Sequence, residues 1–129
     1  SDARLQRYVR NVPDVAWQLI DCAVHPTTLI LDGAVNLAPN LIAADGSIGI
    51  RITAEPFSRQ LCYRFQKALV STSANISGEP AAQNYRDIDP RILEQVDYVC
   101  WTRRQEHKPH RPSSIIKLTG SGEVTVIRP

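Results

Sequence analysis

Residues 70–80 read VSTSANISGEP, and they carry more information about the fold than any other stretch of the chain. Six of these eleven residues are small or hydroxylated, and the stretch follows directly on Leu69. An apolar, β-branched lead-in that gives way to hydroxyls, an amide and a Gly-Glu-Pro turn predicts a strand over 69–70 that ends in a polar loop. Loops at strand ends are where α/β proteins hold ligands. The stretch therefore predicts an α/β fold with a ligand-binding loop.

The same loop has a simpler interpretation. Ser and Thr clusters ahead of Gly and Pro are usually turns, in which the side chains satisfy their own backbone. Hydroxyls and an Asn amide are also neutral donors and acceptors that suit a phosphate, a carboxylate or a sugar. Composition leaves both interpretations open, so the particular order of the residues has to decide.

Hydrophobic periodicity on either side of the loop predicts alternating helices and strands. Helices are expected over 2–9, 13–23, 57–68 and 90–95, and strands over 28–31, 48–52, 69–70, 96–101, 114–118 and 124–127. The last two strands flank a Thr-Gly-Ser-Gly hairpin signal, and residues 36–46 read as an irregular loop over one face. We therefore predict a single domain over 1–129, an α/β fold with a mixed, twisted β-sheet flanked by helices.

Within the strand expected over 48–52, three isoleucines alternate with Gly49 and Arg51. Alternate residues of a strand point to opposite faces of the sheet. The pattern predicts that the Arg51 guanidinium lies on the face away from the core.

Composition places the chain among soluble proteins. It has 129 residues, of which 43% are hydrophobic and 22% charged, and a formal net charge of +2. That charge is too small to indicate nucleic-acid binding by itself. No apolar run is long enough to cross a bilayer, so we expect no membrane association and a cytoplasmic protein.

The three cysteines, Cys22, Cys62 and Cys100, are odd in number, far apart and set in apolar patterns. This usage favours reduced, buried thiols over a disulfide framework. Cys100 with His107 and His110 makes only a weak zinc candidate, because no C-x-x-C pair accompanies them. We predict no metal ligands and no catalytic nucleophile.

The densest basic character lies over 103–111, which we call the basic loop. Its simplest interpretation is a solvated loop. The alternative is a loop that faces phosphate or RNA, because its arginines and lysine suit anions as well as water.

The order of residues in the polar loop decides between its two interpretations. STSANISGEP, residues 71–80, resembles the S-T-S-A-N-x-S-G-E-P signature of the YrdC-like family, whose best-known members are threonylcarbamoyl-AMP synthases. Four more blocks resemble the family in the same order: PTTLIL at 26–31, IGIRI at 48–52, RPSSIIKL at 111–118 and VIRP at 126–129. The resemblance runs from about residue 23 to the end, and it implies the YrdC-like α/β fold.

Two features depart from the family pattern. Val24-His25-Pro26 stands where the family has P-G-P, so the turn before Thr28 lacks the freedom of a glycine. The family's opening strand and its K-x-R motif also have no counterpart, which suggests a domain truncated at its N-terminus. Since the missing pair would help to neutralise phosphates, we expect these 129 residues alone to be weakly active or inactive.

The resemblance implies an enzyme, a nucleotidyltransferase that joins L-threonine, bicarbonate and ATP into threonylcarbamoyl-AMP for threonylcarbamoyladenosine formation in tRNA. ATP would be a substrate, and Mg²⁺ could accompany it. The chain contains neither G-x-x-x-x-G-K-[ST] nor G-x-G-x-x-G, so the ATP site must use other donors. Holding two negatively charged reactants together requires positioning and fixed positive groups rather than a nucleophilic side chain.

The resemblance also implies roles for individual residues. Arg51 matches the arginine that pairs with the threonine carboxylate, and Thr72 and Ser113 match positions near the amino acid. The positions that match nucleotide contacts are Ser73, Ala74, Asn75, Ala82 and Arg128. Thr28 matches less well because the turn before it diverges.

Three other functions stay open. One is a different carbamoyl-transfer enzyme of the same family. Another is a module that binds tRNA or double-stranded RNA without catalysis, for which the mild basicity and the basic loop argue. The last is a purely structural domain.

Overall fold

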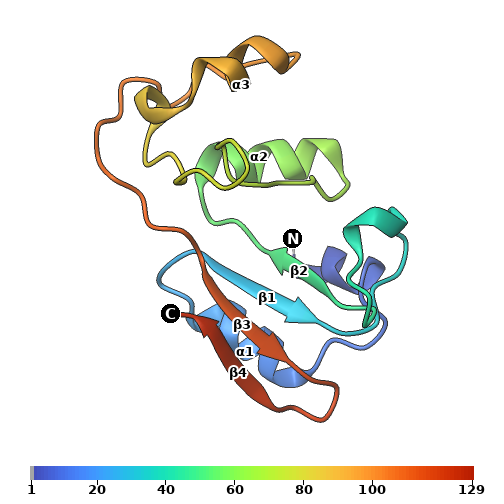
Figure 1. The fold of residues 1–129 in the computed structure, drawn as a ribbon. Helices are drawn as coiled ribbons and strands as arrows, with labels where there is room; N and C mark the ends of the chain where they lie inside the picture. The colour runs from blue at the N-terminus through green and yellow to red at the C-terminus, as the bar shows by residue number, and fades with distance from the viewer. Residues whose placement is uncertain (1) are drawn as a thin grey trace. The chain divides into compact units, whose positions relative to one another are not determined.

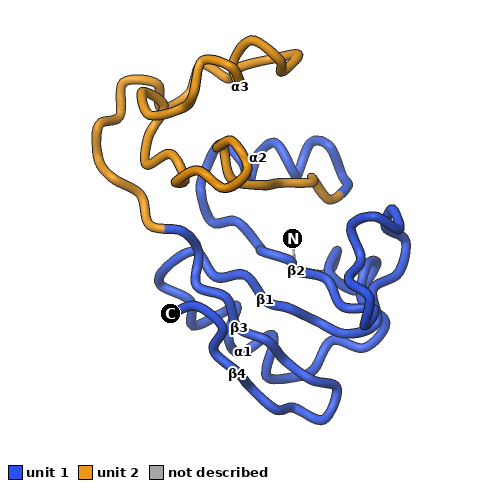
Figure 2. Tube along the Cα trace, in the orientation of Figure 1, with its two compact units in different colours: residues 1–67, 112–129 blue, residues 68–111 orange. Residues whose placement is uncertain are grey.

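The computed structural model describes residues 2–129, which fall into two compact units (Figures 1 and 2). Unit 1 comprises residues 1–67 and 112–129, and unit 2 comprises residues 68–111. Unit 1 contains, in chain order, the 3₁₀ helix η1 (Asp2–Arg7), α1 (Asp14–Cys22), β1 (Thr27–Leu31), the 3₁₀ turn η2 (Pro39–Leu41), β2 (Ile48–Arg51), α2 (Pro56–Phe65), β3 (Ser114–Leu118) and β4 (Val124–Arg128). Unit 2 contains the 3₁₀ turn η3 (Tyr85–Asp87) and α3 (Pro90–Gln95).

The four strands of unit 1 form one mixed sheet in the order β2-β1-β3-β4. β1 pairs antiparallel with β2 and parallel with β3, and β3 pairs antiparallel with β4. Between β1 and β3 lie more than eighty residues of chain, so the central strand pair depends on a contact that is remote in sequence. The mixed sheet and its helices confirm the predicted α/β class.

One face of this sheet carries the core. Leu29 and Leu31 of β1 and Leu118 of β3 are buried together with Ala16 of α1, and α1 lies against this face of the sheet (Figure 1). Leu5 and Val9, from η1 and the residues just after it, complete the buried cluster. The alternation of a strand sends Thr28 and Ile30 to the opposite face, which α1 leaves open.

α2 begins at Pro56, one residue before the predicted start. The Glu55 carboxylate accepts hydrogen bonds from the backbone N–H of Phe57 (3.0 Å) and of Ser58 (2.7 Å), and Pro56 occupies the first turn. The helix ends at Phe65, and the next residue, Gln66, adopts a left-handed conformation with φ of 61°. The helix therefore stops short of the predicted residue 68.

Two predicted strands are wrong. Residues 69–70 and 96–101 have no strand structure, and the side chains of Val70, Tyr98 and Trp101 are exposed. β-branched and aromatic residues form a strand only when a neighbouring strand pairs with their backbone. Unit 2, to which both segments belong, contains no strand to supply that pairing. The first predicted helix is also corrected, since residues 2–7 form a 3₁₀ helix rather than an α-helix.

The three cysteines are free, as predicted, but they are not buried. Cys22 and Cys100 are exposed and Cys62 is half-buried. Within residues 2–129, no helix is both long and apolar enough to cross a bilayer.

Candidate functional site

The strand register gathers four of the predicted site residues at one end of the open sheet face. Thr28 of β1 is paired with Arg51 of β2 and with Ile115 of β3, and Ile115 is paired with Arg128 of β4. Directly paired residues project from the same face of a sheet. Since Leu29 and Leu31 face the core, this set faces away from it. Ser113 immediately precedes β3 and joins the same group.

Two hydroxyls form the centre of this group. Thr28 Oγ1 and Ser113 Oγ are 2.7 Å apart, although 85 residues separate them in the chain. Arg128 holds the second of them: its Nε donates to the Ser113 carbonyl at 2.8 Å, and its Nη2 lies 3.5 Å from Ser113 Oγ. The hydroxyl pair is thereby fixed from β1 on one side and from β4 on the other. Thr28, whose match to the family pattern is less certain, thus contacts Ser113, whose match is closer.

Arg51 differs from Arg128 in having a free guanidinium. Its side chain is exposed, as the alternating isoleucines predicted. Among the described residues of unit 1, its guanidinium has no hydrogen-bond or ion-pair partner. A planar group with five donors and no internal acceptor is suited to a carboxylate or a phosphate from outside the protein.

Beside these residues, the open face has a hollow of about 400 Å³. The sheet lines its floor with Thr28, Ile30, Ile48, Gly49 and Ile115, and the loop before β2 lines its wall with Asn40, Leu41, Ile42, Ala43 and Ser47. A Cβ at position 49 would lie 3.4 Å from the Thr28 Cγ2 atom. Glycine at this position therefore leaves more room in the hollow than a larger residue would. Sequence reasoning missed Gly49 and the wall residues. The signal available was the aperiodic stretch over 36–46, which was predicted to cover one face.

The wall of the hollow is fixed by a local polar contact. Asp45 Oδ1 accepts hydrogen bonds from the Ser47 hydroxyl (2.6 Å) and from the Ser47 N–H (3.0 Å), and Lys117 Nζ lies 3.5 Å from Asp45 Oδ2. These donations, the Ser47 hydroxyl above all, lower the pKa of Asp45. Ser47 is buried, so this contact holds the loop against the sheet.

The remaining predicted site residues, Thr72, Ser73, Ala74, Asn75 and Ala82, lie in unit 2. Within that unit Asn75 organises the polar loop, since its Nδ2 donates to the carbonyls of Glu79 (3.0 Å) and Ile76 (3.1 Å). The turn closes through the Glu79 N–H, which donates to the Ile76 carbonyl at 2.9 Å, with Gly78 in a left-handed conformation. Asn75 Oδ1 is buried and accepts no hydrogen bond from the described residues.

The structure therefore brings together Thr28, Arg51, Ser113 and Arg128 within unit 1. It presents the residues at 72–74 as exposed side chains of a separate unit. That the two sets act on one ligand stays a prediction.

The basic loop is partly neutralised within unit 2. Glu106 pairs with Arg103 and with His110, each at 3.4 Å, and Arg104 donates to the backbone carbonyls of Val99 and Cys100. Across residues 2–129, no three or more His, Cys, Asp or Glu side chains come together as a possible metal site.

Comparison with known proteins agrees with this architecture. A family model for Sua5/YciO/YrdC, described as "Telomere recombination", matches residues 1–129. The chain belongs to this family. The resemblance predicted from the STSANISGEP loop is confirmed at the level of the family.

Curated relatives in the family carry the name threonylcarbamoyl-AMP synthase. One from Stenotrophomonas maltophilia is 39% identical over 99 residues, which is 74% of this chain and 53% of the relative. A putative one from Methanocaldococcus jannaschii is 38% identical over 108 residues, covering 83% of this chain and 49% of the relative. The chain thus spans about half the length of these relatives.

The fold is shared with a solved structure. The crystal structure of E. coli YciO matches 99% of this chain and 61% of its own, with a TM-score of 0.80 and 24% sequence identity. This likeness supports the predicted α/β fold class and says nothing of what the protein binds.

Proposed function

We propose that the protein to which this chain belongs makes threonylcarbamoyl-AMP from L-threonine, bicarbonate and ATP, as a nucleotidyltransferase that serves tRNA modification. The names of its relatives support this reaction. The observation that carries the proposal is the exposed guanidinium of Arg51, which has no partner in unit 1 and stands across the β1–β2 pair from Thr28.

In this proposal the open sheet face holds the amino acid. Arg51 would bind the threonine carboxylate through two parallel N–H···O bonds, the geometry for which a planar guanidinium is suited. The Thr28 and Ser113 hydroxyls, which are 2.7 Å apart, would form hydrogen bonds with the bound threonine as donors or acceptors. Thr72 would complete the amino-acid site.

The nucleotide would be held mainly by neutral groups. Ser73, Asn75 and the backbone at Ala74 and Ala82 would supply donors and acceptors, and Arg128 would supply positive charge. The buried Oδ1 of Asn75 is an acceptor that an amino group or a water of the complex could satisfy. Mg²⁺ would enter with the ATP phosphates, since the described residues offer no cluster of carboxylates for a site of their own.

The chemistry needs two bond-forming steps. The threonine nitrogen attacks the bicarbonate carbon and water leaves, which yields a carbamate. A carbamate oxygen then attacks the α-phosphorus of ATP, and the bond to pyrophosphate breaks. Both reactants of the second step are anionic, so its barrier falls chiefly through alignment and fixed positive charge.

The test is release of pyrophosphate by the full-length protein supplied with all three substrates. We expect release to stop when threonine or bicarbonate is left out, and threonylcarbamoyl-AMP to appear in step with pyrophosphate. Release that continues without threonine, or none with all three substrates present, contradicts the proposal.

A further inference from the structure

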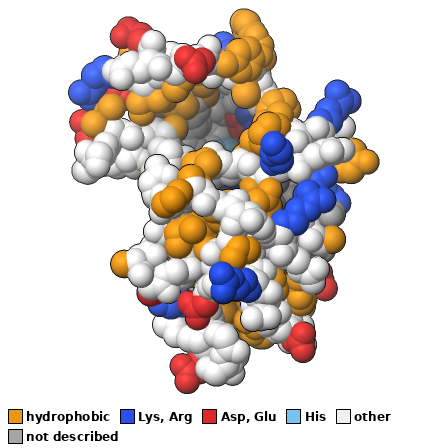
Figure 3. Space-filling view, turned by 90° about the vertical axis from the view of Figure 1, so that its right-hand side faces the viewer, with side chains coloured by type: hydrophobic (Ala, Val, Ile, Leu, Met, Phe, Trp, Pro, Cys, Tyr) orange, Lys and Arg blue, Asp and Glu red, His pale blue; other side chains and the backbone are white. Residues whose placement is uncertain are grey.

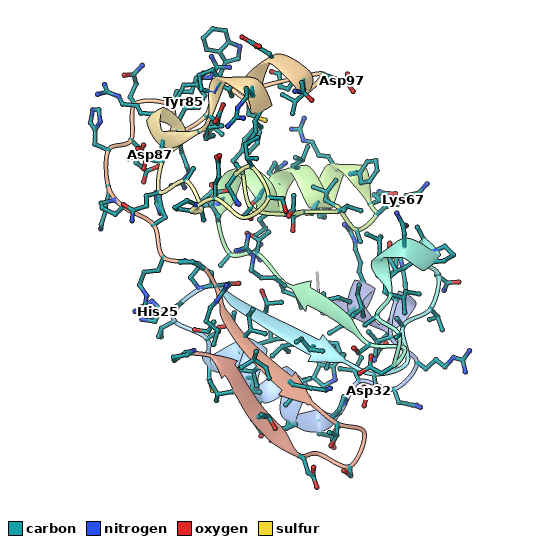
Figure 4. All side chains as sticks on the ribbon, viewed as in Figure 1. His25, Asp32, Lys67, Tyr85, Asp87 and Asp97 are labelled. Carbon is teal, nitrogen blue, oxygen red and sulfur yellow. The ribbon has the colours of Figure 1, made fainter. Side chains whose placement is uncertain are left out.

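A charged contact joins the polar loop over 71–80 to α3. Arg91 of α3 places its Nη2 3.4 Å from Glu79 Oε1, and both side chains are about half exposed. Figure 4 draws the side chains as sticks and labels Tyr85 and Asp87 of η3, the turn that lies between the loop and α3 in the chain. The contact therefore connects two segments of unit 2 across twelve positions of the sequence.

Arg91 is itself fixed at the start of α3. Its Nη2 donates to Asp89 Oδ2 at 2.7 Å and its Nε to Asp89 Oδ1 at 3.0 Å, the paired geometry that a planar guanidinium favours. Asp89 is also the N-cap of the helix, because its Oδ1 accepts a hydrogen bond from the Arg91 N–H at 2.9 Å. The guanidinium thus reaches Glu79 from a defined position.

Glu79 in turn orients the amide of Asn75. The Glu79 carbonyl accepts a hydrogen bond from Asn75 Nδ2 at 3.0 Å, and the Ile76 carbonyl accepts one from the same nitrogen at 3.1 Å. Both donors of the amide are used in this way, and Asn75 Oδ1 is left buried with no partner among the described residues. A buried acceptor without a partner is destabilising, so it favours a ligand that supplies a donor.

We propose that Arg91 is a positioning residue of the nucleotide site. Through Glu79 it holds the Asn75 amide in the orientation that leaves Oδ1 free to accept a hydrogen bond from the bound nucleotide complex. This inference rests on the proposed function, in which Asn75 binds the nucleotide. It adds to that function a residue that lies outside the stretch matching the family signature.

The low burial of unit 2 is the reason that one ion pair matters. No residue of the unit is buried, so polar contacts have a larger share in fixing the loop than they would in a packed core. Acidic and basic side chains are open to water on the face shown in Figure 3, and exposed ion pairs add little to the free energy of folding. Loss of the contact should therefore loosen the Asn75 amide without unfolding the protein.

The test combines ATP binding with NMR of the Asn75 side chain, both on the full-length protein. In Arg91→Ala we expect the Asn75 side-chain amide signals to shift and to exchange faster with solvent, because the Glu79 carbonyl is less well fixed. The dissociation constant for ATP should rise about 2- to 10-fold, the effect of ordering one more polar side chain on binding. The melting temperature should stay within about 3 °C of that of the unmodified protein.

A double-mutant cycle shows whether Arg91 acts through the Glu79 carboxylate. If it does, Glu79→Ala should weaken ATP binding to a similar extent, and the double variant should bind no more weakly than either single variant. Arg86→Ala is the matched control, since Arg86 is an exposed arginine of η3 whose side chain has no hydrogen-bond or ion-pair partner among the described residues. This control should leave the Asn75 signals and the ATP affinity unchanged.

Unchanged Asn75 signals in a folded Arg91→Ala variant would overturn the inference, as would additive losses in the cycle or an equal loss in Arg86→Ala. Failure of the proposed function gives a different result, because the unmodified protein would then bind no ATP. The Asn75 signals need no ligand, so in that case their response to Arg91→Ala still decides whether Arg91 positions Asn75.

Discussion

The two units of the chain are stabilised in different ways. Among the described residues, all six buried hydrophobic side chains lie in unit 1, where they join a helix to a four-stranded sheet. Unit 2 has no buried residue among its 44 positions and no strand. The contacts between its segments include hydrogen bonds from Asn84 Nδ2 to the His107 carbonyl at 3.3 Å and from the His110 N–H to the Gln83 carbonyl at 3.2 Å.

This difference in burial indicates that unit 1 is the more rigid of the two units and unit 2 the more adaptable. Hydrophobic burial makes the sheet a firm support for the hydroxyl pair and for Arg51. Segments with few buried apolar contacts open at lower free energy, and ligand-binding loops are commonly drawn from them. The exposed polar loop over 71–80 and the basic loop both belong to the less buried unit.

The largest expected effect tests the core itself. Leu118 is fully buried in β3, so Leu118→Ala should lower the free energy of unfolding by about 2–5 kcal/mol, the cost of a cavity that cannot fully collapse. The matched control is Leu93→Ala in α3, where a half-buried side chain should cost less than about 2 kcal/mol. Urea denaturation followed by circular dichroism measures both. Equal losses would remove the contrast between the units.

The next effect tests whether the firm unit holds the substrate. Arg51→Ala should weaken threonine binding to the intact enzyme by about 1.5–3 kcal/mol, the usual worth of a hydrogen bond to a charged group. Arg64→Ala, which removes an exposed arginine of α2, serves as the control and should leave the affinity unchanged. Titration calorimetry measures the affinity. If Arg51→Ala binds threonine normally, Arg51 is not part of the site.

A smaller effect tests the hydroxyl pair. Thr28→Val and Ser113→Ala each remove one hydroxyl of a contact 2.7 Å long, so their effects on unfolding should couple by about 0.5–1.5 kcal/mol. The control pair replaces Thr28→Val by Thr27→Val, because the Thr27 hydroxyl bonds instead to the His25 carbonyl at 2.9 Å. The control pair should be additive within experimental error. Additivity in the first pair would mean that the two hydroxyls do not stabilise each other.

The smallest expected effect is a loss of stability in acid that comes from an ion pair of unit 2. The Arg91 side chain donates to Asp89 and lowers the pKa of Asp89 from 3.8 to about 2. A carboxylate with a lowered pKa in the folded state stabilises that state above its unfolded pKa. The contribution is therefore present above pH 4 and is lost as the pH falls from about 4 to about 2.

A carbon-detected NMR titration of the Asp89 carboxyl group measures this pKa directly. In Asp89→Asn, the acid-dependent loss of stability in that window should become smaller, while Asp97→Asn should leave its size unchanged. A midpoint near 4 for Asp89 would show that the ion pair does not form in solution.

Prediction from the sequence was accurate where hydrophobic periodicity reflects burial. The isoleucines at 48, 50 and 52 placed Arg51 on the open face, and the apolar stripes of α1 and α2 placed both helices within a few residues. It was wrong at 69–70 and 96–101, where strand-forming residues lie without a partner strand in their unit. Strand propensity describes a residue's fit to a sheet and cannot supply the neighbouring strand.

The site residues show the same contrast between what the local sequence predicts and what strand pairing decides. A continuous run of residues, such as 71–80, is read directly from the sequence, because its ten letters match the family pattern without a gap. The contact between Thr28 and Ser113, the hydrogen bonds from Arg128 to Ser113 and the hollow above Gly49 arise only when β1 and β3 pair. Thr28 and Ser113 are 85 positions apart in the chain. Local sequence determines which face of a strand a side chain takes, since that depends on alternation alone. Which strands become neighbours depends on how the whole chain buries its apolar surface, and this is a property of the tertiary structure.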